Sequence, residues 1–203
     1  MKYLSIDIET TGLNANTDQI LQLAAVLEDT QKQVRVEELP YFQCNVWHPQ
    51  YHGNATALSM NAEILKQLGS VRNEQLDGIY EQGKAYTARF DNLFSIFREW
   101  CKGVGLLEKD DTGKQINIVA AGKNAASFDI PFITKLPMYV NILKHRVLDP
   151  TMYFIDWKND MVPPESKECC KRAGIEYTNE AHTALWDARM VIQLLRAGYA
   201  YSK

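Results

Sequence analysis

Two apolar segments near the amino terminus constrain the fold more than any other feature of the sequence. Residues 2–8 (KYLSIDI) predict a strand, and residues 19–29 (QILQLAAVLED) predict a second, more fully buried strand after the turn-prone stretch NANTD. Residues 34–47 are strand-like too, but Pro40 interrupts them, which is typical of an edge or bulged strand. We therefore expect the chain to begin with three strands.

The rest of the chain alternates between helix and strand signals. Apolar side chains recur at three- and four-residue steps between Thr87 and Lys102, which predicts a helix whose aromatic face packs into the core and not against a cofactor. The other expected elements are a short helix at residues 61–68, a strand at 116–121, a helix start at 128–136, a short strand at 146–149, and helices at about 164–173 and 183–199. This order indicates an α/β fold, with a mixed central sheet flanked by helices.

Length and composition fit one domain over residues 1–203. The chain is 46% hydrophobic and 23% charged, which is ordinary for a globular protein with a single core. Residues of about 49–86 are polar and rich in glycine. They remain unassigned beyond the short helix and could form an insertion.

We expect a cytoplasmic protein that does not enter the membrane. No apolar run approaches the ~20 residues of a membrane span, and the amino terminus lacks the basic and apolar segments of a secretory signal. The four cysteines have no CxxC spacing, and the adjacent Cys169 and Cys170 are poor candidates for a structural disulfide, so we expect reduced thiols. The net charge of −3 means that a polyanionic partner would have to be held locally or through metal ions.

Two acidic residues, Asp7 and Glu9, end the first predicted strand, in the stretch DIETTGL. Side chains two residues apart on a strand point to the same face, so the two carboxylates would share one space. At about 4 Å they would repel by roughly 4 kcal/mol at an effective dielectric near 20, and a divalent cation between them would remove the repulsion. The alternative is that Asp7 starts a turn and Glu9 is solvated. The glycine of TTGL would allow another molecule to approach the backbone closely.

A further carboxylate, Asp129, lies in the stretch AAGKNAASFDIPF. It follows a predicted strand that ends near Gly122, and it lies in the first turn of a helix, where a lone aspartate is usually a cap. It could also be a third carboxylate at the end of the sheet. In that case Asn124 would bond neighbouring backbone and Phe128 would anchor the turn in the core.

The stretch EAHTALWDA places His182 just before the last predicted helix and Asp187 within it. Asp187 lies on a side of that helix that the apolar stripe does not occupy. Each residue alone could face solvent or bond local backbone. Together, a helix-borne carboxylate and a loop histidine are also what a metal-assisted hydrolase needs.

The stretches DIETTGL, NAASFD and AHTALWDA, in this order, resemble the three exonuclease motifs of the DEDDh (DnaQ-like) family of 3′→5′ exonucleases. The resemblance covers about residues 2–29, 116–136 and 165–197, and it implies a ribonuclease H-like fold. Residues of about 40–115 carry no recognised motif. The spacing between His182 and Asp187 matches the histidine subtype of the family.

The resemblance implies a metal-dependent active site. Four carboxylates would hold two Mg²⁺ or Mn²⁺ ions, with Asp7 as the bridge and His182 as the general base: Asp7, Glu9, Asp129 and Asp187. Hard oxygen ligands suit these ions, and two of them about 3.5–4 Å apart can activate a water and stabilise the leaving oxygen. The usual histidine pKa of about 6.5 suits a base at neutral pH. The expected substrate is single-stranded DNA or RNA with a free 3′ end, cut to nucleoside 5′-monophosphates.

The resemblance also implies substrate contacts. The loop after the first motif, Thr10 to Leu13, would lie against the terminal nucleotide, with its backbone amides toward the 3′ hydroxyl and Leu13 wedged against the last base; for Leu13 core packing is the alternative. These loop residues and two residues of the second motif are the substrate-binding candidates: Thr10, Thr11, Gly12, Leu13, Asn124 and Phe128.

Two other segments are weaker candidates. Many relatives carry a histidine- or glycine-bearing signature after the third strand, and here the comparable place reads ATALSMNAEIL, which leaves only Met60 and Asn61 to meet the penultimate nucleotide. The basic cluster Lys144, His145 and Arg146 could touch the phosphate backbone or form a solvated loop.

Other functions remain open at this point. The chain could be a proofreading or nucleic-acid-binding subunit that acts mainly through a polymerase or another protein partner. A docking subunit would carry a partner-binding tail, which we do not expect so soon after the last predicted helix, and a non-catalytic module would lack a carboxylate. A metal-independent nucleotide-binding protein would need a glycine-rich phosphate loop, and neither common form of that motif is present.

Overall fold

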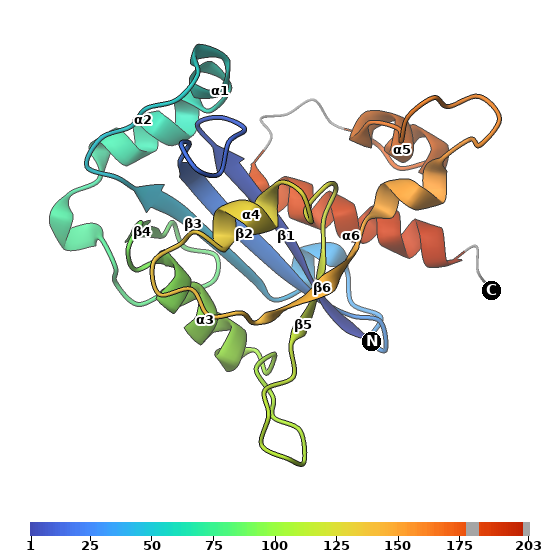
Figure 1. Cartoon of the computed structure of the whole chain (residues 1–203), viewed down its shortest axis with the longest axis horizontal. Helices are drawn as coiled ribbons and strands as arrows, with labels where there is room; N and C mark the ends of the chain where they lie inside the picture. The colour runs from blue at the N-terminus through green and yellow to red at the C-terminus, as the bar shows by residue number, and fades with distance from the viewer. Residues whose placement is uncertain (178–182, 201–203) are drawn as a thin grey trace.

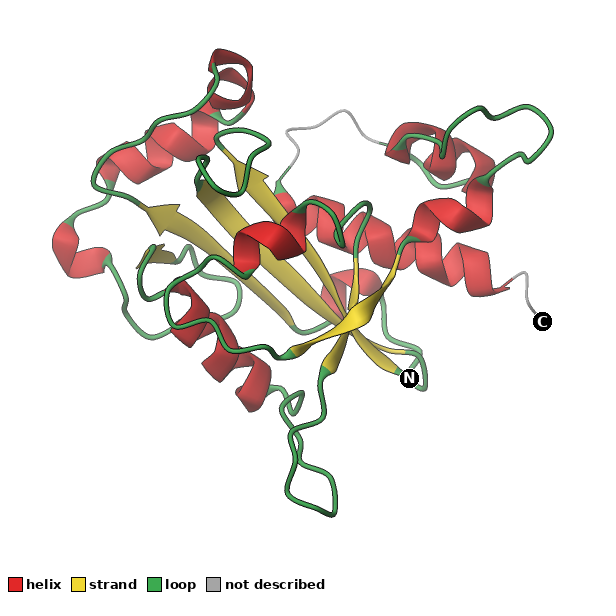
Figure 2. Ribbon diagram, in the orientation of Figure 1, coloured by secondary structure: helices red, strands yellow, loops and turns green. Residues whose placement is uncertain are grey.

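The computed structural model describes residues 1–177 and 183–200. A six-stranded mixed sheet lies at its centre, with helices on both faces (Figures 1 and 2). The strands are β1 (Lys2–Thr10), β2 (Ile20–Asp29), β3 (Tyr41–Trp47), β4 (Thr87–Arg89), β5 (Ile118–Ala121) and β6 (Leu143–Leu148). The predicted α/β fold is confirmed.

The helices lie mostly after the first three strands. The α-helices are α1 (Ala55–Met60), α2 (Ala62–Ser70), α3 (Leu93–Gly103), α4 (Asp129–Ile133), α5 (Ser166–Ala173) and α6 (Ala184–Ala200). The 3₁₀ helices are η1 (Val36–Glu38), η2 (Asn73–Gln75) and η3 (Pro150–Phe154). None of the helices in the described ranges is long and apolar enough to cross a membrane.

Strand β1 runs through the middle of the sheet, whose order is β4-β3-β2-β1-β5-β6. The β1–β2 and β2–β3 pairs are antiparallel, and the other three pairs are parallel. The β1–β5 pairing involves only Leu4 and Ser5 of β1, whereas β2 accompanies β1 as far as Thr10. The second half of β1 therefore has a strand neighbour on one side only, and its other side is open to a different element.

Alternate side chains of β1 enter two separate cores. Leu4, Ile6 and Ile8 pack on one face with the aromatic side chains of α3 and with α4. Tyr3 enters the core on the other face, where α6 covers β1 and β2. Asp7 and Glu9 share the face of Tyr3 by the two-residue period, so the sheet directs both carboxylates toward α6.

The expected helix at residues 87–102 is wrong at its start. Thr87–Arg89 forms β4, a sixth strand parallel to the end of β3, and α3 begins only at Leu93. Asp77 holds this strand in place, because its carboxylate accepts the backbone N–H of Arg89 at 2.8 Å and the guanidinium at 2.7 Å. The apolar periodicity that predicted the helix begins at Phe90 and did not require the earlier residues to be helical.

Three smaller expectations also need correction. Pro40 precedes β3 and does not interrupt it, since its carbonyl accepts the N–H of Leu27 at 2.9 Å and residues 36–38 turn into η1. The segment at 49–86 holds two α-helices in place of one short helix, and the second packs against Leu21. Strand β6 is longer than the expected 146–149. The four cysteines are buried and free, as expected.

Gly122, directly after β5, lies where a side chain would not fit. A Cβ at this position would lie 2.6 Å from the Cβ of Ala125 and 2.9 Å from the carbonyl oxygen of Ile6. We expect Gly122→Ala to lower the free energy of unfolding by about 1–3 kcal/mol, because backbone must move to relieve the overlap. Urea denaturation measures the change.

The matched control is Gly69→Ala in α2, where a Cβ would meet nothing within 4 Å. Alanine there should stabilise the protein by about 0.5–1 kcal/mol, since glycine is a poor helix former. Equal unfolding free energies for the two variants would show that the close approach at Gly122 is not a constraint.

Candidate active site

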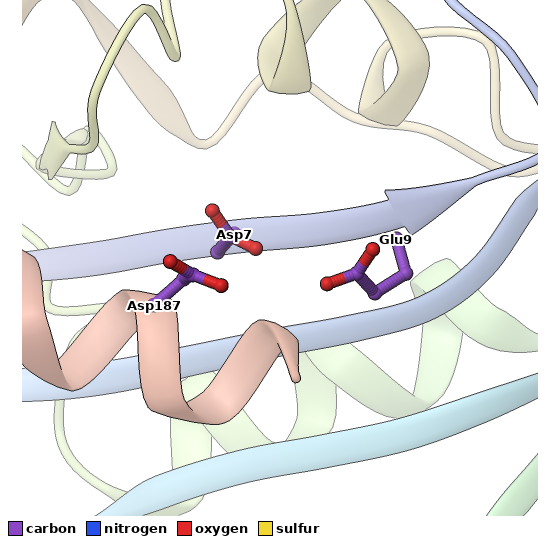
Figure 3. A group of neighbouring side chains, drawn as sticks. All are labelled: Asp7, Glu9 and Asp187. Atoms are coloured by element: carbon purple, nitrogen blue, oxygen red, sulfur yellow. The ribbon is translucent and has the colours of Figure 1, made fainter. Parts of the chain in front are cut away.

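Three carboxylates from two elements meet at the end of β1. Asp7 and Glu9 come from β1 and Asp187 from the first turn of α6, and each offers an oxygen within 4.8 Å of the others. Figure 3 shows the carboxylates of Glu9 and Asp187 directed toward each other, with Asp7 beside them. The structure thus brings together three of the five residues predicted to form the catalytic centre.

Buried contacts between α6 and β1 fix the position of Asp187. The hydroxyl of Ser5 donates to the carbonyl of Ala188 at 2.8 Å. At the start of the helix, Thr183 accepts the N–H of Asp187 at 3.0 Å and, through its hydroxyl, the N–H of Trp186 at 3.3 Å. Ala188 directly follows Asp187 in α6, so the hydrogen bond from Ser5 holds this part of the helix against β1. Rotation of α6 that moved Asp187 away would break this buried hydrogen bond.

Asp129 lies beside the three carboxylates but is not a member of their 4.8 Å group. It is buried at the first turn of α4, and its Oδ1 accepts the N–H of Ile8 at 3.0 Å. This N–H faces the side of β1 that β5 leaves open. Asp129 therefore connects α4 to β1 with one oxygen, while its charge still acts on Asp7 and Glu9.

Burial and mutual repulsion raise the pKa of these carboxyl groups. Burial is the larger cause for Asp7, whose pKa lies well above its ordinary value, and the charges of Asp129, Asp187 and Glu9 add to it. Burial and then Asp187 raise the pKa of Glu9 to about 7, against the opposing effect of the Asn61 amide. The pKa of Asp129 rises to about 7, mainly through burial. Such a cluster favours protons or a cation in its centre.

The residue types fit a divalent metal ion. All the candidate ligands are carboxylate oxygens, which Mg²⁺ and Mn²⁺ prefer, and a cation of charge two would compensate the repulsion that raises these pKa values. His182, the predicted general base, lies outside the described residues.

The loop after β1 is held in one shape by its own hydrogen bonds. The hydroxyl of Thr10 donates to the carbonyl of Gly12 at 2.6 Å, and the hydroxyl of Thr11 accepts the N–H of Gln19 at 2.9 Å. Both threonines are buried, so their hydroxyls support the loop. Leu13 is 81% exposed, which rules out core packing for this side chain. Within the described part of the chain, the N–H groups of Gly12 and Leu13 donate no hydrogen bond.

The two candidates from the second motif, Phe128 and Asn124, differ in burial. Phe128 is half-buried against the core and packs on Phe132, as expected for an anchor of the turn. Asn124 is exposed in a left-handed conformation with φ of 56°, and it is its carbonyl, not its side chain, that accepts the N–H of Phe128.

Met60, the last residue of α1, and Asn61, the residue between α1 and α2, differ in their exposure to solvent. Met60 is 81% exposed, whereas Asn61 is buried and donates its amide to the carbonyls of Thr10 and Ala57. Asn61 therefore connects the end of α1 to the loop after β1, and its amide also stabilises the charged form of Glu9. The basic cluster is distant: Lys144 lines a hollow with Met1 and Lys2, at the end of the sheet where β1 begins.

Sequence reasoning missed Gln22 in β2. It is 4% exposed and is the cross-strand partner of Glu9, and its Oε1 accepts the N–H of Ala184, the first residue of α6, at 3.0 Å. Gln22 thereby connects the strand pair that carries two carboxylates to the helix that carries the third. One signal was available: Gln22 is the only polar residue in the stretch from Ile20 to Leu27, which is otherwise apolar.

Replacing Glu9 tests the electrostatics of the site. Because the folded-state pKa of Glu9 lies at about 7, above its usual value of 4.5, the metal-free protein should lose stability as pH rises from about 4.5 to 7. We expect Glu9→Gln to be more stable than the parent by about 1–3 kcal/mol at pH 8 in EDTA, with little difference at pH 4.5. Thermal or urea unfolding across this pH range measures it.

Glu63→Gln, at an exposed position of α2, is the control and should change stability by less than about 0.5 kcal/mol at either pH. A Glu9→Gln protein that is less stable than the parent at pH 8 would show that Glu9 is favourably charged without metal.

Replacing Gln22 tests the connection to α6. Gln22→Met keeps the size of the side chain but leaves the N–H of Ala184 without an acceptor, which should cost about 1–3 kcal/mol. Gln22→Glu keeps the acceptor oxygen and should retain a larger part of the stability. If the methionine variant is as stable as the parent in urea, the hydrogen bond does not hold the helix.

Comparisons with known proteins support the fold. No protein-family model matches the chain, and no curated protein matches it in sequence. Among solved structures it is similar to cell-death related nuclease 4 (CRN-4), with a TM-score of 0.61 and 12% identity over 99% of this chain and 64% of that one. It is also similar to exonuclease I, with a TM-score of 0.60, 15% identity and coverage of 98% and 41%.

A further similar structure is E. coli exonuclease I in complex with a 5cy-dT13 oligonucleotide, with a TM-score of 0.58, 15% identity and coverage of 98% and 40%. The chain spans less than two thirds of the length of each of these proteins. At such low identity the likeness concerns the fold, which is ribonuclease H-like.

Proposed function

We propose that this protein is a metal-dependent 3′→5′ exonuclease that acts on single-stranded DNA or RNA and releases nucleoside 5′-monophosphates. The observation that carries the proposal is the group of three carboxylates, Asp7, Glu9 and Asp187, within 4.8 Å of one another. The ribonuclease H-like fold and its likeness to three nuclease structures support it. The three sequence stretches that resemble exonuclease motifs contain the same residues.

The carboxylates would hold two Mg²⁺ or Mn²⁺ ions, with Asp129 as the fourth ligand beside the group of three. Bound there, the ions would lower the pKa of a water and stabilise charge on the leaving oxygen. Asp129 keeps one oxygen on the N–H of Ile8, so its second oxygen is the one available to a ligand. His182 would take the proton of the attacking water, since it precedes the helix that carries Asp187.

The loop between Thr10 and Leu13 supports the proposed preference for a free 3′ end. The N–H groups of Gly12 and Leu13, which donate to no acceptor among residues 1–177 and 183–200, would donate to the terminal sugar, and the exposed Leu13 side chain would pack against the last base. The loop does not need to reorganise to do so, because Thr10 and Thr11 already fix its shape. Binding to a preformed loop loses less conformational entropy than binding to a flexible one.

The direct test is hydrolysis of 5′-labelled single-stranded oligonucleotides, DNA and RNA in parallel, with Mg²⁺ or Mn²⁺. We expect stepwise shortening from the 3′ end with release of 5′-mononucleotides, and no shortening in EDTA. Asp7→Asn should lower kcat by about 10²–10³-fold or more, the scale on which loss of one preorganised electrostatic group acts.

Asp111→Asn, at an exposed position of the loop between α3 and β5, is the matched control and should keep full activity. A 3′-phosphorylated oligonucleotide should resist hydrolysis if a free 3′ hydroxyl is bound. Internal cleavage, or shortening that persists in EDTA, would refute the proposal.

A further inference from the structure

A second polar feature lies on the same face of the sheet as the carboxylates. Gln22, Gln43, Asn45 and Gln67 line a hollow of about 280 Å³, together with Tyr41 and Tyr86. Gln22 thereby exposes a carboxamide to this hollow from a part of β2, residues 20–27, that is otherwise apolar and buried. None of these groups takes part in the proposed hydrolysis.

Three of the carboxamides form hydrogen bonds with one another. Gln22 donates its Nε2 to the Oδ1 of Asn45 at 2.7 Å, and Asn45 donates its Nδ2 to the Oε1 of Gln67 at 3.2 Å. This chain fixes the orientation of three amides across β2, β3 and α2. It leaves a rigid polar wall with defined donors and acceptors.

Other polar groups of the hollow form no hydrogen bond with the described residues of the chain. Within the described part of the chain, no hydrogen bond involves the carboxamide of Gln43, the Nε2 of Gln67 or the hydroxyl of Tyr41. Gln43 is half-buried, so its amide is partly removed from water as well. These groups offer both donors and acceptors to a ligand.

The residues that line the hollow are mostly uncharged, which indicates the class of ligand that it could bind. Lys84 is the one cation of the hollow, and it already pairs with Glu81, so the hollow is poorly suited to a phosphate. Neutral amides and tyrosine rings suit a neutral planar ring with hydrogen-bonding edges, since glutamine and asparagine can bond the edge of a base while aromatic side chains stack on its face. The volume is at the small end of ligand sites, which suits one such ring.

The hollow also lies on the strands next to the one that carries Asp7 and Glu9. Glu9 is opposite Gln22, and Gln22 is opposite Asn45 in the register of the three antiparallel strands. Strands are about 4.8 Å apart, so Asn45 lies about 10 Å across the sheet from Glu9. Nucleotides are about 3.4 Å apart in a stacked strand and farther in an extended one. That distance corresponds to two or three nucleotides.

We propose that this carboxamide hollow holds an unpaired base two or three nucleotides upstream of the 3′ end of the substrate. The inference rests on the proposed exonuclease function and names a second contact for the same strand. Gln43 provides the free amide that bonds the edge of the base, and Gln67 adds a donor from α2. A substrate too short to reach the hollow lacks this contact.

The test uses 5′-fluorescein pentanucleotides in which one base, at the second, third or fourth place from the 3′ end, is removed to leave an abasic sugar. Binding is measured by fluorescence anisotropy with Ca²⁺ in place of Mg²⁺. We expect removal of one particular base, the third or the fourth from the 3′ end, to weaken binding about tenfold. Gln43→Met should weaken binding of the intact oligonucleotide to a similar extent and should not weaken binding of that abasic one further.

Hydrolysis in Mg²⁺ gives an independent readout. Gln43→Met and Gln67→Met should raise KM for the pentanucleotide several-fold, and leave kcat and the hydrolysis of a dinucleotide unchanged. Gln31→Met, at an exposed turn after β2, should behave as the parent in every assay.

The outcomes separate the two proposals. If the parent shortens oligonucleotides but binds every abasic pentanucleotide as well as the intact one, the hollow is not a base site and the exonuclease proposal stands. If the parent neither binds nor shortens any of them, both proposals are overturned. Equal KM values for Gln43→Met and the parent on the pentanucleotide would also overturn the inference.

Discussion

Repulsion among the carboxylates of Asp7, Glu9, Asp129 and Asp187, of which Asp129 is buried and the others half-buried, is the constraint on which the rest of the structure depends. At an effective dielectric near 20, two such charges at about 4 Å repel by roughly 4 kcal/mol, a large part of the 5–15 kcal/mol that separates folded from unfolded protein. The pKa values of Glu9 and Asp129 are each raised to about 7, mainly by burial and further by the neighbouring carboxylates, which is the direction expected for acidic groups held close together. Two apolar cores, one on each face of β1, supply the opposing stabilisation.

The same constraint explains why the polar contacts near the site are buried. Ser5, Gln22 and Asn61 each make a hydrogen bond that a small rotation of its helix or strand would break. Buried hydrogen bonds of this kind resist displacement, because an unpaired group in the interior loses its hydration without compensation. The carboxylates therefore cannot move apart to relieve their repulsion. Protonation or a bound cation is the remaining means of relief, which is why a rigid acidic cluster of this kind could hold a metal ion.

The sequence predicted those parts of the site that depend on local geometry. The two-residue period of a strand was enough to place Asp7 and Glu9 on one face, and the apolar stripe of the last helix was enough to place Asp187 off that stripe. That α6 would pack on this face of β1 is a property of the assembled sheet, and only the resemblance to a family suggested it. The role of Gln22 depends on a partner 162 residues away, and β4 consists of three residues beside β3. Neither leaves a periodic pattern in its own segment.

The distribution of charge also constrains how a nucleic acid could be held. Most protein contacts to nucleic acids are made by lysine and arginine to phosphates, and their affinity falls steeply with salt. Here the net charge is −3, and the basic cluster at Lys144 lies near the start of β1, away from the carboxylates. Affinity for the strand would then come from the metal ions at its 3′ end and from uncharged contacts to its bases, at Leu13 and in the carboxamide hollow. The two proposed contacts would both engage bases that are not paired, and they would therefore favour the end of a single strand over a duplex.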